Sequence, residues 1–134
     1  MSLRENVIAA VAAALVAANV ASGRIYRSRQ DAFAFDELPA VIVGPLSESA
    51  SEEVLGMLDR TLTVRLSVYG KIAPGDAGID ATIAAAEAAV LADRSIGLGS
   101  DVQVSSLVDT SWDFGEQDGV RADIDFQIRM RTVL

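Results

Sequence analysis

The last fifteen residues of the chain alternate apolar and polar side chains. Apolar residues occupy the even positions from Val120 to Met130. A period of two predicts a strand with one face against a core and the other toward water or a partner. The outward positions are Arg121, Asp123, Asp125, Gln127, Arg129 and Arg131. We expect this charged face to contact other charged surfaces.

Four further segments have strand patterns. Residues 60–69 alternate like the closing strand, and residues 38–44 (LPAVIVG) form a β-branched run. That run predicts a strand buried on both faces, with Pro39 at its first position. Residues 24–29 predict a short strand and residues 102–112 a looser one. The inward positions of the alternating segment are Leu62, Val64, Leu66 and Val68.

Two segments have helical periodicity. Residues 3–20 predict a helix, and residues 79–93 predict a second one. Ser2 followed by Glu5 has the spacing of a capping box, and Gly23 is a stop signal. The apolar stripes are Val7, Ile8, Val11 and Leu15 in the first helix and Ile79, Ile83, Ala86 and Val90 in the second.

Glycine, proline and acidic residues mark the connections. Residues 45–58 predict either a hairpin arm or a mobile loop, residues 70–78 a loop, and residues 115–119 a hairpin turn. The resulting order is α-β-β-β-α-β-β. We therefore predict an α+β fold, a mostly antiparallel sheet with two helices packed on one face. The 134 residues (1–134) are expected to form a single domain.

The composition excludes several kinds of chemistry. The chain has no histidine and no cysteine, which removes imidazole bases, thiolates, disulfides and ordinary zinc or iron–sulfur sites. Its net charge is −8, from 19 acids against 11 bases, which disfavours a grip on nucleic-acid phosphates. Residues 7–18 are apolar but too short to span a bilayer. We expect a soluble protein made in a cytoplasm, with no cofactor, no bound metal and no membrane contact.

Asp123 and Asp125 are the strongest candidates for chemistry. They lie on the same strand face, as a metal-binding or proton-sharing pair would require. Arg121 and Arg129 flank them on that face, so neutralisation by arginine is the favoured interpretation. A small metal-dependent hydrolase built on the two aspartates is the alternative.

Arg24, Arg27 and Arg29 form the most concentrated positive charge. In an acidic protein this cluster favours a row of salt bridges between subunits. A phosphate or nucleic-acid site is the alternative.

Two smaller features favour structural roles. Trp112 and Phe114 end a predicted strand and are interpreted as core residues, with an exposed interface anchor as the alternative. Glu48, Glu52 and Glu53 lack the spacing of a calcium loop and predict a solvated segment.

Several segments together resemble a known family. RIYRSRQDAFAFDELPAVIVGPLSE is followed by RTLTVRLSVYG, a Gly/Pro loop, an Ala-rich helix and a closing strand pair. This arrangement is similar to the tail terminator or tail completion proteins of long-tailed bacteriophages, the minor tail protein U group often found in prophages. The most specific element is ELPAVIV, residues 37–43.

The resemblance implies a non-enzymatic virion assembly protein. Such a subunit would form a ring, expected to be a hexamer, that caps the tail tube, ends its polymerisation and provides the head-docking surface. The implied partners are the tail-tube protein and a head–tail connector, with DNA passing through the ring without sequence-specific contact. The implied location is the host bacterial cytoplasm during assembly and then the virion tail. Alternatives are another neck or connector protein, a tail-tube subunit, or a host-side binding or immunity module.

A ring requires a heterologous interface, in which one patch meets a different patch on the neighbouring subunit. We expect arginines of the closing strand to meet acids of the next subunit. The arginines are Arg121, Arg129 and Arg131, and the acids are Asp123, Asp125, Glu52 and Glu53.

Overall fold

A computed structural model describes residues 2–27, 37–71, 76–99, 101–113 and 119–133. The elements are α1 (Leu3–Ala17), the 3-10 turn η1 (Val20–Gly23), β1 (Ile25–Arg27), β2 (Ala40–Val54), β3 (Met57–Lys71), α2 (Asp76–Leu91), β4 (Val102–Asp113) and β5 (Gly119–Val133). This is the predicted order, and the fold is α+β. No helix in the described ranges is long and apolar enough to cross a membrane.

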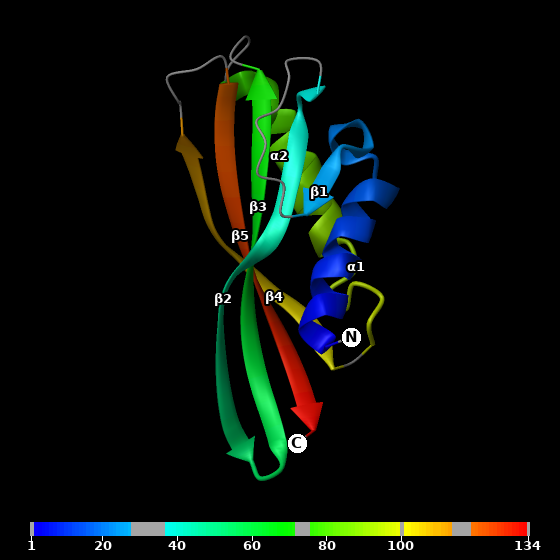
Figure 1. The fold of residues 1–134 in the computed structure, drawn as a ribbon, viewed down its shortest axis with the longest axis vertical. Helices are drawn as coiled ribbons and strands as arrows, with labels where there is room; N and C mark the ends of the chain where they lie inside the picture. Colours follow the sequence, from blue (N-terminus) through cyan, green and yellow to red (C-terminus); the bar gives the residue numbers. More distant parts are fainter. Residues whose placement is uncertain (1, 28–36, 72–75, 100, 114–118, 134) are drawn as a thin grey trace.

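The described strands form one sheet in the order β1-β2-β3-β5-β4. β1 pairs with β2 in parallel, and the other three pairings are antiparallel. α1 and α2 lie on the same face of the sheet (Figure 1). The sheet therefore has one face covered by helices and an opposite face, called here the outer face, that carries none of them.

The core lies between the helices and the sheet. Alternate residues of β3 and β5 are in register, so that Val64 opposes Phe126 and Leu66 opposes Ile124. All of these side chains are buried, as are both predicted helix stripes. The Ser2 hydroxyl accepts a hydrogen bond from the backbone N–H of Glu5 at 3.1 Å, which confirms the predicted cap.

α1 ends earlier than predicted, at Ala17 rather than at residue 20. Asn19, Ala21 and Ser22 have left-handed backbone conformations, which a continuing helix does not allow. The resulting turn directs Val20 into the core, where it is buried. Burial of an apolar side chain thus accompanies the early end of the helix.

β2 and β3 extend far beyond their predicted bounds. Residues 45–58 form a hairpin arm, which settles the alternative left open by the sequence. Its turn is Leu55–Gly56, where Gly56 has a φ of +85° that glycine adopts without strain. The two strands run on together past the helices, toward the lower end of the view (Figure 1). The predicted burial of residues 38–44 on both faces is wrong at Ile42, which is partly exposed because no helix covers the outer face.

Gly70 belongs to β3 and not to a loop as predicted. It is buried against α2, and a Cβ at this position would lie 1.7 Å from Cγ2 of Ile79. The absence of a side chain therefore allows the start of α2 to approach the sheet. Residues 72–75 of the predicted 70–78 loop lie outside the described residues. The same holds for residues 115–118 of the predicted 115–119 turn.

β4 is an edge strand with two irregularities in its pairing, at Val104–Ser106 and at Leu107–Asp109. Trp112 opposes Ala122 on the helix-bearing face, but its side chain is 48% exposed. The prediction of a core tryptophan is therefore wrong. At this margin the sheet extends beyond the cover of the helices, as Figure 1 shows. Phe114 lies outside the described residues.

Candidate interaction surface

The centre of the outer face is more buried than the sequence predicts. Asp123 and Asp125 are 8% and 7% exposed, although both point away from the core. β5 lies between β3 and β4, so neighbouring side chains cover its aspartates on both sides. Arg65 donates to Asp125 from Nε at 2.8 Å and from Nη2 at 3.0 Å. This bidentate hydrogen bond raises the pKa of Arg65.

Asp123 is held by two donors. The Ser67 hydroxyl donates to it at 2.8 Å, and Arg121 donates from Nη2 at 3.1 Å. The sequence predicts that Arg121 and Arg129 neutralise the aspartate pair. Arg121 does contact Asp123, but the partner of Asp125 is Arg65 and not Arg129. Arg65 lies sixty residues from Asp125 in the chain, and only its outward position in residues 60–69 pointed to this face.

The arm end of the outer face is organised differently. Arg131 of β5 donates from Nε to Asp59 of β3 at 2.8 Å. This hydrogen bond lowers the pKa of Asp59. Arg129, two residues away on the same face, makes no hydrogen bond or ion pair with any other described residue. It is exposed, and its charge acts on Asp59 only through space.

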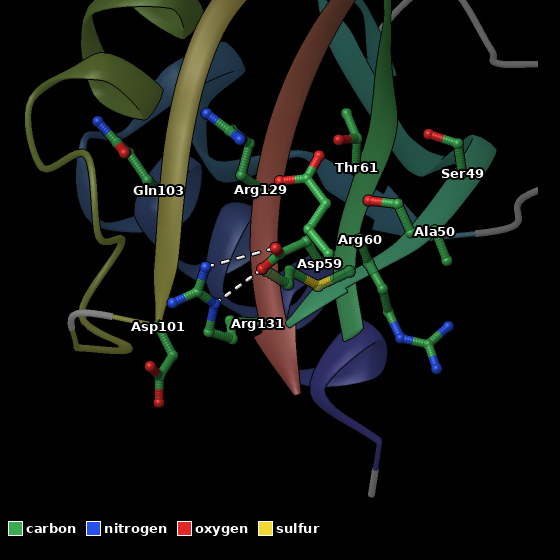
Figure 2. A pocket seen from close by; sticks show the side chains of 12 residues that line it. Ser49, Ala50, Asp59, Arg60, Thr61, Asp101, Gln103, Arg129 and Arg131 are labelled. Atoms are coloured by element: carbon green, nitrogen blue, oxygen red, sulfur yellow. Dashed lines mark hydrogen bonds and ion pairs between the residues drawn. The ribbon is translucent and has the colours of Figure 1, made fainter. Parts of the chain in front are cut away.

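A shallow depression of about 560 Å³ surrounds Arg129. Its floor includes one cross-strand row in which Ser49, Thr61, Arg129 and Gln103 oppose one another. Figure 2 shows Arg129 between Gln103 of β4 and Thr61 of β3, with the Arg131–Asp59 pair beside it. Arg129 thus presents a guanidinium without an ion-pair partner beside the hydroxyl and amide groups of this row, and the depression is also lined by the carboxylates of Glu53, Asp59 and Asp101. A guanidinium in this state can pair with a carboxylate of another molecule.

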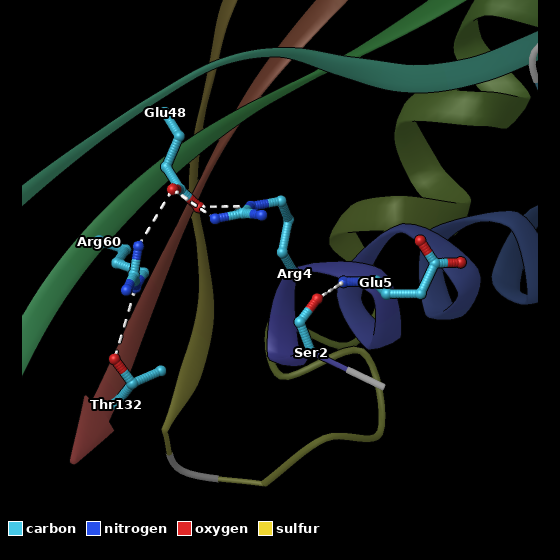
Figure 3. Close-up of polar contacts among 6 residues, drawn as sticks. All are labelled: Ser2, Arg4, Glu5, Glu48, Arg60 and Thr132. Carbon is cyan, nitrogen blue, oxygen red and sulfur yellow. Dashed lines mark hydrogen bonds and ion pairs between the residues drawn. The ribbon is translucent and has the colours of Figure 1, made fainter. Parts of the chain in front are cut away.

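A chain of polar contacts braces the arm against α1 (Figure 3). Arg4 donates to both carboxylate oxygens of Glu48, at 3.0 and 2.9 Å. Arg60 donates to the same carboxylate at 3.2 Å and to Thr132 of β5 at 3.4 Å. The hydrogen bond from Arg4 is the main reason why the pKa of Glu48 is lowered. Glu48 therefore belongs to a structural contact and not to a solvated loop as predicted.

A bulge places Glu48 on the correct face for this contact. The pairing of β2 with β3 shifts between Pro45 and Ser47, so Leu46 is an extra residue in β2. Because side chains alternate along a strand, one extra residue turns the following positions to the opposite face. Glu48 consequently opposes Leu62 on the helix-bearing side. Nothing in the sequence pattern indicates this reversal.

The arginines near β1 make local contacts. Arg24 donates to the backbone carbonyl of Pro39 at 2.9 Å. Arg27 donates from Nη2 to Glu5 of α1 at 3.0 Å and makes an ion pair with it. Arg29 lies outside the described residues. The two described arginines thus hold β1 to β2 and to α1, and the predicted salt bridges between subunits stay a prediction.

The described residues contain no group of three or more acidic side chains placed to hold a metal ion. Asp123 and Asp125 are already engaged by Arg121 and Arg65. Among the described residues, the outer face therefore has paired charges at its centre and, at its arm end, an exposed arginine without an ion-pair partner.

Comparison with known proteins places the fold. No family model matches this chain, and no curated protein matches it either. A solved structure described as "Virion of native gene transfer agent (GTA) particle" contains a chain that superposes with a TM-score of 0.61. The alignment covers 92% of this chain and 93% of that chain, at 23% sequence identity. The two chains share a fold.

Proposed function

We propose that the protein is a structural component of a phage-like virion that ends the tail tube as an oligomeric ring. The observation that carries this proposal is the shared fold with a chain of the gene transfer agent virion, which extends over nearly the whole length of both chains. Because the alignment covers 92% of this chain and 93% of that chain, the likeness extends over the whole fold and not only over a local motif.

Two features support the more specific role of a tail terminator. The first is the resemblance of ELPAVIV and its flanking segments to that family. The second is the outer face, whose aspartates are neutralised by arginine, which supports a role in protein contacts and not in metal chemistry. In this role the protein contacts the tail-tube protein and a head–tail connector, in the host cytoplasm and then in the virion.

The test is electron microscopy of tails assembled with and without this protein. A terminator is expected to give tails of uniform length when present and overlong tubes without bound heads when absent. Supplying the protein in trans should restore uniform tails, which serves as the control. Tails of normal length in its absence would refute the proposal.

Electron microscopy of the purified protein distinguishes a tail-tube subunit, the principal alternative in the same class. A tube subunit polymerises without limit, so the purified protein would form long tubes in concentrated solution. A terminator closes into rings of fixed size. Calorimetric titration with Mg²⁺ and Ca²⁺ addresses the hydrolase alternative, because saturable binding that disappears in Asp125→Ala would favour an enzyme.

A further inference from the structure

The tip of the arm exposes apolar side chains that have no role in the core. Leu55, in the hairpin turn, is 92% exposed, and the neighbouring Val54 is about half exposed. Val133 of β5 opposes Met57 beside this turn and is also largely exposed. Turns of this kind usually carry polar residues. An apolar cluster at the end of a projecting arm is typical of a protein contact site.

Arg129 lies on the same end of the molecule. It is four residues before Val133 along β5, and its guanidinium is without a hydrogen bond or ion pair to another described residue. The arm end therefore combines exposed aliphatic groups with a cation that has no ion-pair partner among the described residues, next to the carboxylates of Glu53, Asp59 and Asp101. Its complement is a surface that presents apolar side chains together with unpaired carboxylates.

The second half of β4 presents that combination. Leu107 and Trp112 are exposed apolar residues on the helix-bearing side of the strand, and Asp109 and Asp113 are exposed on its outer face. Neither aspartate makes a hydrogen bond or ion pair with another described residue, although Asp109 also acts electrostatically on Arg65. β4 is the edge of the sheet, so its side chains on both faces are accessible to a partner approaching the edge.

We propose that the arm end of one copy of this chain docks on the β4 edge of the next copy. The tip residue Leu55 would pack against Trp112, and Arg129 would pair with the carboxylate of Asp109 or Asp113. The arm tip and Trp112 lie at opposite ends of the sheet, because the arm end is formed by the last residues of β5 and Trp112 opposes Ala122, near its start. Leu107 and Asp109 oppose the middle of β5. The eleven residue steps from Ala122 to Val133 span roughly 36 Å at strand spacing.

Contact between opposite ends is heterologous, and repeated heterologous contacts give a ring or a filament. A symmetric contact of two arm ends would bring two unpaired Arg129 side chains together and would leave the β4 surface uncovered. The head-to-tail contact pairs the cation and covers both apolar patches. The proposed contact rests on the proposed function only in its closure into a ring. The contact itself requires no tail tube.

The test uses cysteine crosslinking, for which the chain is well suited because it contains no native cysteine. Leu55→Cys and Trp112→Cys proteins are mixed and oxidised over a range of concentrations up to the millimolar range. Disulfide-linked pairs of the two different variants are expected, and a chain carrying both substitutions should give a ladder of covalent multimers. Val16→Cys, also exposed but on α1, is the matched control and should not link to Leu55→Cys.

A charge exchange tests the electrostatic part of the contact. Arg129→Glu is expected to raise the concentration for half-association in sedimentation velocity by about tenfold. Adding Asp109→Arg or Asp113→Arg to that variant should recover most of the loss. All these positions are exposed, and far-ultraviolet circular dichroism of each variant checks that it is folded.

The proposal is overturned if the Leu55–Trp112 disulfide forms at no concentration, or no faster than the Val16 control. Dominant Leu55–Leu55 crosslinks would indicate a symmetric contact and would also overturn it. These measurements use purified protein, whereas the terminator role is judged by tail length. Failure of one can therefore be separated from failure of the other.

Discussion

The centre of the outer face and the arm end differ in the pairing of their charged groups and in the exposure of their side chains. At the centre, Asp123 and Asp125 are buried, Asp125 accepts hydrogen bonds from Arg65, and Asp123 accepts them from Arg121 and Ser67. At the arm end, Leu55 is almost fully exposed and Arg129 has no ion-pair partner among the described residues. The two aspartates at the centre of the outer face are thus paired within one chain, whereas Leu55 and Arg129 at the arm end are exposed and available to another molecule.

The largest difference in stability is expected when a leucine is replaced by alanine at the centre of the sheet and at the arm tip. Leu66→Ala removes a fully buried side chain of β3 and should lower the free energy of unfolding by about 2–5 kcal/mol. Leu55→Ala changes an exposed side chain and should alter it by no more than about 0.5 kcal/mol. Urea unfolding followed by circular dichroism measures both. Similar losses for the two variants would show that the arm tip packs within the monomer.

Two glycines allow a second comparison. Gly70→Ala introduces a Cβ into the space of Ile79, so β3 and α2 must separate, and we expect a loss of about 1–3 kcal/mol. A Cβ added at Gly44 of β2 would meet no other side chain or backbone atom within 4 Å, so Gly44→Ala should be neutral or slightly stabilising. Thermal unfolding of the two variants provides the measurement. A destabilised Gly44→Ala protein together with an unaffected Gly70→Ala protein would contradict the helix–sheet contact.

Replacing arginine by methionine tests the paired and unpaired charges. Arg65→Met leaves the buried Asp125 carboxylate without its bidentate partner and should cost about 1–3 kcal/mol. Arg129→Met breaks no hydrogen bond to a described residue and should leave stability within about 0.5 kcal/mol. Chemical denaturation at neutral pH separates them. Equal effects would mean that Arg129 has a partner within the chain.

The smallest effect is expected at the brace between α1 and the arm. The hydrogen bond from Arg4 holds the pKa of Glu48 below its ordinary value of 4.5. A carboxylate with a lowered pKa stabilises the folded state fully above its ordinary value, and this contribution is lost as the pH falls through the lowered value. Glu48→Gln should therefore be slightly less stable than the parent at pH 7, and the difference should shrink below pH 4.5.

Denaturation of the parent and of Glu48→Gln at several pH values measures this difference. Arg4→Gln should show the same convergence at low pH, because it removes the other half of the contact. A difference that is constant with pH would assign the loss to packing and not to the ion pair.

Local periodicity predicted most of the fold. The helix stripes through Val7 and Ile79, the inward positions of β3 and β5 and the Ser2 cap are all confirmed. Each of these depends on residues a few positions apart, so the pattern is visible in the sequence. The element order follows from the same local signals.

The contacts that define the candidate surface depend on distant residues. Arg65 reaches Asp125 across sixty residues, and Arg4 reaches Glu48 only because a bulge at Leu46 reverses the face. The exposure of Trp112 depends on how far the helices extend over the sheet, which the pattern of β4 does not contain. Arg129 is among the expected interface residues, but its lack of an internal partner can be recognised only once the partners of Arg121 and Arg131 are known.

The bulge at Leu46 has a geometric consequence for assembly. β2 and β3 are each fifteen residues long, so a small rotation where the arm leaves the body becomes a large displacement at its tip. A bulge increases local strand twist and so sets the direction of the arm. In a head-to-tail contact through the arm, that direction fixes the angle between successive subunits. Deleting Leu46 would remove the bulge, turn Glu48 away from Arg4 and redirect the arm, so it would change the curvature of such an assembly and hence the number of subunits that closes it.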